Sequence, residues 1–125
     1  MQIAEETGTA LMVHHNGSSM TITEVLNQMR PGDSYTHCFH PSAGPGTDTA
    51  MVDTDTLGEE CIKARDRGII FDLGHGQGSW SWNVAEAAAH ADFWPDSLST
   101  DLHVASCNGP AYDIHHFKYK IHHFC

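Results

Sequence analysis

The sequence predicts an α/β fold in which crossover helices connect the strands of a parallel sheet. Short apolar runs alternate with segments whose apolar residues recur at helical spacing, in the order strand, helix, strand, helix, strand, helix, strand. The connections are mostly short, and this alternation is typical of parallel sheets. In such sheets, ligands bind beyond the carboxyl ends of the strands.

Four strands are expected from apolar content and from the turn residues that bound them. The first is a continuous apolar run, typical of a strand buried on both faces. The third is followed by a glycine-rich turn, and the second by a long stretch of proline, glycine, serine, threonine and aspartate at residues 40–56, which predicts a loop. The expected strands cover residues 10–14, 34–39, 69–73 and 96–102.

The helices carry recognisable end signals. Residues 3–7 read as the end of a helix that Gly8 stops, and Thr21 followed by Glu24 has capping-box spacing for the next helix. A third helix is expected over 57–67, with basic residues in its last turn. An alanine-rich helix should follow at 83–90, and the tail from residue 112 to Cys125 predicts a weak helix.

Composition limits the classes of partner. A chain of 125 residues with 40% apolar residues corresponds to at most one globular domain. Sixteen acidic residues against six basic ones give a net charge of −10, which disfavours nucleic acid and anionic membrane and favours cations. No apolar run approaches the roughly 20 residues of a membrane span.

The first residues and the cysteines indicate a compartment. Residues 1–6 are acidic and lack an apolar core, so no signal peptide is predicted. The four cysteines, at positions 38, 61, 107 and 125, form no C-x-x-C motif. We therefore expect a cytoplasmic protein with reduced thiols.

Each expected strand has, at its carboxyl end, a residue whose side chain can bind a metal ion. Because these ends face the same way in a parallel sheet, the side chains can converge. Imidazole and carboxylate are ligands that zinc prefers, and a carboxylate near the metal can also act as a general base. The strand-end residues are His14, His37, Asp72 with His75, and Asp101 with His103.

Simpler interpretations of the same residues stay open. A single histidine at a strand end is more often a partly buried residue with its hydrogen bonds satisfied than a metal ligand. The pairs at 14–15 and 115–116 could simply lie on the surface. Asp72 could cap the following turn through backbone N–H groups. The turn at 74–79, GHGQGS, could form an anion pocket without metal, although it matches neither common nucleotide-binding motif.

Four stretches together resemble the amidohydrolase superfamily, in its dihydroorotase-like, deacetylase-type branch. They are LMVHHNGSS, RPGDSYTHCFH, IIFDLGHGQGSWSW and STDLHVASCNGPAYD, within residues 3–114. The resemblance implies a TIM-type (β/α)8 barrel with one or two zinc ions, of which this chain would supply strands five to eight as a half-barrel. It also implies hydrolysis of a carbon–nitrogen or ester bond in a small molecule.

The resemblance assigns roles to particular residues. His14 and His37 would bind metal at the ends of the fifth and sixth strands. Asp101, at the end of the eighth, would bind metal and act as the catalytic base. The residues expected near the substrate are His75, His103, Asn108 and Gly109, whereas His40 receives no role.

The sequence also departs from the family pattern. The family's first-strand His-x-His pair has no counterpart here, and none of Lys63, Lys118 and Lys120 occupies a strand where the family places its bridging lysine. We therefore expect residues 1–125 to be one partial domain, truncated at the N-terminus and at the C-terminus, and inactive alone. Such a chain would form a homo-oligomer or bind a complementing N-terminal half. The alternative is a non-catalytic, metal-binding or assembly half-barrel.

Overall fold

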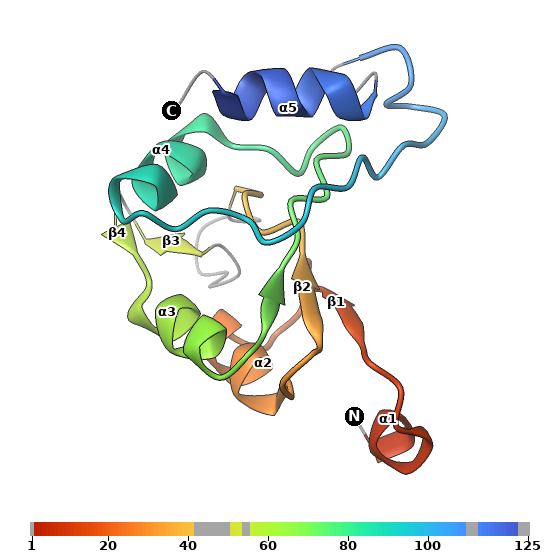
Figure 1. Cartoon of the computed structure of the whole chain (residues 1–125), viewed down its shortest axis with the longest axis vertical. Coiled ribbons are helices and arrows are strands. Elements are labelled where there is room, and N and C mark those ends of the chain that lie inside the picture. Colours follow the sequence, from red (N-terminus) through yellow and green to blue (C-terminus); the bar gives the residue numbers. More distant parts are fainter. Residues whose placement is uncertain (1, 42–50, 54–55, 110–112, 123–125) are drawn as a thin grey trace.

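A three-stranded parallel sheet lies at the centre of the molecule (Figure 1). The computed structural model describes residues 2–41, 51–53, 56–109 and 113–122. The strands are β1 (Met12–His14), β2 (Ser34–Thr36) and β5 (Ile70–Phe71), in the order β1-β2-β5. Both pairs are parallel, which confirms the predicted α/β class.

The register divides the side chains between two faces of the sheet. Val13 lies opposite Tyr35, which lies opposite Phe71. Tyr35 and Phe71 are fully buried, with ring centroids 5.8 Å apart. Neighbouring positions point to the other face. There Met12 is 67% exposed and Ile70 39% exposed. The prediction that the first strand is buried on both faces was therefore wrong, because this face of the sheet is exposed at β1 and at β5.

Helices α2 (Ile22–Gln28) and α3 (Glu59–Asp66) pack against each other. The capping box is confirmed: Thr21 Oγ1 accepts a hydrogen bond from the N–H of Glu24 at 3.1 Å, and the Glu24 carboxylate accepts one from the N–H of Thr21 at 2.8 Å. The core joins these helices to the sheet and to α4 (Trp82–His90), and its largest fully buried members include Tyr35, Phe39, Phe71, Ile22, Leu26, Met51 and Ile69.

A small antiparallel hairpin lies inside the range that was expected to be a loop. It consists of β3 (Val52–Asp53) and β4 (Thr56–Leu57), and α4 contacts both strands. The hairpin strands account for the start of α3 at Glu59 rather than at residue 57. The rest of the expected loop, residues 42–50 and 54–55, falls outside the described residues.

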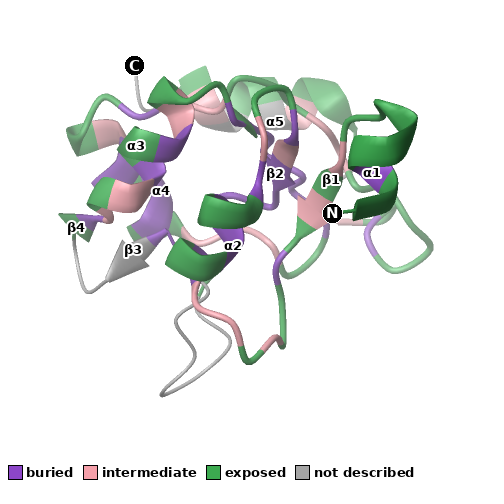
Figure 2. Cartoon of the chain, turned by 90° about the horizontal axis from the view of Figure 1, so that it is seen from below, coloured by how far each residue is buried: buried purple, intermediate pink, exposed green. Residues whose placement is uncertain are grey.

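The terminal helices lie at opposite ends of the view in Figure 1. Helix α1 (Gln2–Thr7) lies beyond β1, away from α2 and α3, and is largely exposed (Figure 2). It ends at Thr7, and the φ of 66° at the following Gly8 confirms the predicted stop. Helix α5 (Ile114–His122) confirms the helical tail within the described residues. No helix in the described part of the chain combines the length and apolar character needed to cross a membrane.

The predicted fourth strand, residues 96–102, was wrong as a regular strand. It forms only an isolated parallel bridge, between Asp72 and Ser97. The N–H groups of Leu73 and His75 donate to the carbonyls of Ser97 and Ser99 at 3.0 and 3.2 Å. The segment thus runs alongside β5 and the residues after it. Its extended part ends at Asp101, whose positive φ of 45° is incompatible with a strand.

Candidate active site

The carboxyl edge of the sheet brings together three of the predicted site residues. His14 is the last residue of β1, and His37 follows β2 directly. Their ring centroids are 4.0 Å apart, with the planes tilted by 50°. Asp101, from the segment beside β5, places Oδ2 3.9 Å from Nε2 of His37. Three separate segments of chain therefore deliver two imidazoles and one carboxylate to one place.

His37 is held in one orientation. It is 5% exposed, and its backbone adopts a left-handed φ of 58°, which ends β2 and turns the ring towards the edge of the sheet. The ring Nδ1–H donates to the carbonyl of Gly74. In the neutral ring, the lone pair then belongs to Nε2, which faces Asp101. Metal-binding histidines are commonly oriented by such a hydrogen bond on the other ring nitrogen.

Two glycines allow the close approach of these groups. Gly74 and Gly76 have φ values of 48° and 50°. A Cβ atom on Gly74 would lie 2.4 Å from Thr36 Oγ1 and 2.9 Å from His37 Nδ1, and one on Gly76 would lie 2.7 Å from Asp101 Oδ2. Because real Cβ atoms do not approach so closely, any larger residue would displace the site.

Asp72 is buried directly after β5 and accepts three hydroxyl hydrogen bonds. The Oδ2 atom accepts from Thr36 at 2.7 Å and from Ser99 at 2.6 Å, and Oδ1 accepts from Ser97 at 2.6 Å. The interpretation of Asp72 as a backbone cap gains no support from these side-chain partners. Sequence reasoning missed the hydroxyl residues. The two-residue spacing of Ser97 and Ser99, which places both on one side of an extended segment, was a usable signal.

His14 has a lowered pKa. Partial burial is the main cause, and the nearby imidazoles of His37 and His40 add repulsion, while Asp101 acts in the opposite direction. His14 is therefore neutral at pH 7. Neutral imidazole is the form that binds metal. His40 itself is buried, with Nδ1 2.6 Å from the carbonyl of Pro41.

The four residues predicted near the substrate differ in their burial and in their contacts. His75 is buried between the two glycines and stacks on Trp80, with ring centroids 5.1 Å apart and planes at 13°. His103 and Asn108 are exposed, and Gly109 bonds locally to Ser106. Within the described part of the chain, these last three residues make no direct hydrogen bond to His14, His37 or Asp101, so their substrate role stays a prediction. Pro110 lies outside the described residues.

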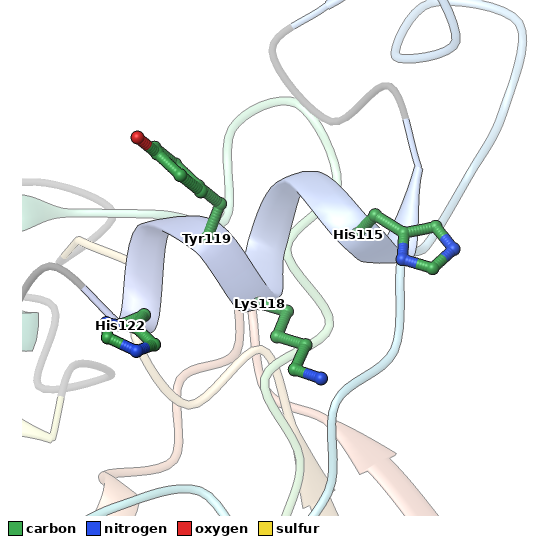
Figure 3. A pocket seen from close by; sticks show the side chains of 4 residues that line it. All are labelled: His115, Lys118, Tyr119 and His122. Carbon is green, nitrogen blue, oxygen red and sulfur yellow. The ribbon is translucent and has the colours of Figure 1, made fainter.

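The donor set suits a zinc-type ion in its chemistry, but it is not assembled into a ligand cage. Two neutral imidazoles and a carboxylate are appropriate ligands. Within the residues that the structure describes, however, no three His, Cys, Asp or Glu side chains are arranged to hold an ion. A hollow of about 440 Å³ lies elsewhere, on one face of α5, and is lined by His115, Lys118, Tyr119 and His122 (Figure 3).

Comparison with known proteins gives consistent relatives by sequence and by structure. The chain is 40% identical over 115 residues to a deacetylase of Brucella anthropi and, to the same extent, to a deacetylase of Agrobacterium fabrum. Each alignment covers 90% of this chain and 27% of the relative. The fold matches a dihydroorotase crystal structure with a TM-score of 0.82 at 34% identity, over 98% of this chain and 31% of that one. An adenine deaminase matches with a TM-score of 0.80 at 35% identity, over 90% and 30%.

The chain belongs to the amidohydrolase superfamily. This confirms the resemblance inferred from the four sequence stretches. No protein-family model matches the chain. As an amidohydrolase segment, it spans about a quarter of the length of the curated relatives that it matches.

Proposed function

We propose that this chain supplies the part of a metal-dependent amidohydrolase that contains strands five to eight of the barrel. The complete enzyme would hydrolyse a carbon–nitrogen or ester bond in a small molecule. The observation that carries the proposal is the convergence of His14, His37 and Asp101 from three segments at the carboxyl edge of the sheet.

The names of the relatives suggest the substrate class. Three curated relatives are called deacetylases, and the structural relatives are a deaminase and a dihydroorotase. We therefore propose an acyl amide or ester, with an acetyl group as the first choice. The exposed carboxylate of Asp101 is accessible to such a substrate from solvent.

Each of the three residues has a proposed role. The complete site would contain one or two zinc ions. His14 and His37 would bind one of them through their imidazole nitrogens, and Asp101 would add a carboxylate oxygen. A bound zinc ion supplies Lewis acidity, which polarises the carbonyl group of the substrate. Asp101 would accept a proton from the attacking water and return it to the leaving group. The Gly74 carbonyl would fix the His37 ring during these steps.

Zinc titration by calorimetry tests the metal role. The double variant His14→Ala/His37→Ala should lose the tightest binding, whereas His115→Ala/His122→Ala, which removes two exposed histidines of α5, should keep it. Equal binding by wild type and by His14→Ala/His37→Ala would contradict the proposal. The chain has 11 histidines, so the second double variant is needed to separate specific from general imidazole binding.

A non-catalytic, metal-binding or assembly half-barrel is the second candidate. Within this candidate, the absence of a three-residue ligand cage among the described residues favours an assembly role over metal binding. Hydrolysis of acetyl amides and acetyl esters, measured with and without added zinc, separates the two candidates. We expect no turnover by these 125 residues alone and zinc-dependent turnover once a complementing N-terminal half is added. Failure of that complementation would favour the second candidate.

A further inference from the structure

We propose that Asp72 is a positioning residue that fixes His37 and Asp101 relative to each other. The inference rests on the proposed function, because it concerns the same two residues. It assigns a role to a carboxylate that neither binds the substrate nor belongs to the proposed ligand set.

The contacts of Asp72 define what it can do. Its side chain is buried, with the residue 2% exposed. Its three partners at 2.6–2.7 Å are hydroxyl groups. All three hydroxyl groups donate to the Asp72 carboxylate, so their protons point at it. One carboxylate therefore fixes the hydroxyl rotors of residues from two different segments.

These hydroxyls lie next to the two strained site residues. Thr36 directly precedes His37, and Ser99 precedes Asp101 by two residues. Both His37 and Asp101 have positive φ values, at 58° and 45°. Such conformations cost energy in residues other than glycine and persist where the surroundings over-determine them. Asp72 restrains the backbone near His37 through Thr36 and the backbone near Asp101 through Ser99.

The backbone of Asp72 reinforces the same junction. Its N–H donates to the carbonyl of Tyr35 at 2.9 Å, and its carbonyl accepts from the N–H of Cys38 at 3.2 Å. His37, which follows β2, is therefore flanked by residues that bond to Asp72: Tyr35 and Thr36 before it and Cys38 after it. Loosening this junction would free the His37 ring from the Gly74 carbonyl.

A second buried carboxylate at the other end of the sheet provides a matched control. Asp33 is 1% exposed and precedes β2, where it pairs with Arg30 at 3.0 Å and accepts the N–H of Leu11 at 2.9 Å. Loss of either carboxylate should destabilise the sheet. Only loss of the Asp72 carboxylate should disturb the site, because the Asp33 carboxylate accepts its hydrogen bonds from Leu11 and Arg30, at the opposite end of the strands.

The experiment compares Asp72→Asn with Asp33→Asn in the full chain. Nitrogen-15 NMR of the His37 ring reports the tautomer, which should be the Nδ1-protonated form in the wild type. Asp72→Asn should convert it to a mixture and should lower zinc affinity by about 10- to 100-fold, the usual cost of losing an outer partner of a ligand. Asp33→Asn should leave both readouts unchanged. Thr36→Val should act like Asp72→Asn, whereas Thr36→Ser, which keeps the hydroxyl, should behave like wild type.

The outcomes separate the inference from the proposed function. Equal changes in the His37 tautomer in Asp72→Asn and Asp33→Asn, or no change in either, would overturn the positioning role. If Asp72→Asn does not fold, the Thr36→Val and Thr36→Ser pair decides by the same criterion. If the wild type binds no zinc, the proposed function fails, and the tautomer comparison still decides the role of Asp72.

Discussion

The Nε2 atom of His37 lies 3.9 Å from the Oδ2 atom of Asp101, although the two residues come from different segments on opposite sides of β5. Both have left-handed backbone conformations. This pairing places an imidazole nitrogen and a carboxylate oxygen face to face at the carboxyl edge of the sheet. The arrangement makes each residue testable by substitution.

Asp101→Asn should abolish turnover in a protein that carries this segment and hydrolyses a substrate. Asparagine keeps the size and one oxygen but cannot accept a proton, so the rate should fall by about 10²–10⁴-fold. Stability should change little, because the carboxylate side chain is 48% exposed and asparagine tolerates a positive φ. Kinetics and thermal unfolding measure the two effects. A near-normal kcat with unchanged metal content would remove Asp101 from the mechanism.

Gly76→Ala should weaken zinc binding and destabilise the fold. An alanine with φ of 50° carries a backbone cost of about 1–2 kcal/mol, and its Cβ would press on Asp101 Oδ2. Gly78→Ala is the control, because a Cβ atom there meets nothing within 4 Å. Urea unfolding and zinc titration compare the two variants. Equal behaviour of both would show that the close approach at Gly76 is unimportant.

Asp33→Asn should reduce stability and flatten its acid dependence. Hydrogen bonds from Arg30 lower the pKa of Asp33 to about 2, from an ordinary value of 3.8. The stabilisation is therefore fully present above about pH 4 and is lost as pH falls towards 2, with a total of about 2 kcal/mol. Urea unfolding between pH 2 and 7 measures it. Asp66→Asn, at an exposed position on α3, should keep the wild-type pH profile.

The chain alone should self-associate rather than persist as a monomer. β1 pairs only with β2 among the described strands, and Met12 is 67% exposed on it. Unpaired apolar edges favour pairing with another chain. Sedimentation velocity should therefore show oligomers, and Met12→Lys should shift the distribution towards monomer. A wild-type chain that stays monomeric at high concentration would contradict this expectation.

The sequence predicted what is encoded locally. The capping box of Thr21 and Glu24, the stop at Gly8 and the strand-end positions of His14 and His37 depend on neighbouring residues, and the structure contains all of them. The family was also recognisable, because four separate stretches carry its pattern.

The errors arose where contacts between distant residues decide the structure. Residues 96–102 were expected to form a regular strand, yet they form only an isolated bridge to Asp72, and Leu98 and Leu102 are 39% and 51% exposed. The hydroxyl contacts of Asp72 join residues from three parts of the chain, and no local pattern specifies such a set. Left-handed conformations at His37 and Asp101 are likewise invisible to periodicity, since neither residue is glycine.

The hydroxyl contacts of Asp72 limit how this site could be transplanted. A designer who grafts His37 and Asp101 onto another parallel sheet would copy two visible functional groups but not the restraint that holds their backbones. Thr36, Asp72 and Ser99 would have to be moved with them. Position 74 would have to stay glycine, because its carbonyl holds the His37 ring and a Cβ atom there would clash with Thr36 and His37. The smallest transferable unit is therefore the junction of three chain segments rather than a pair of side chains.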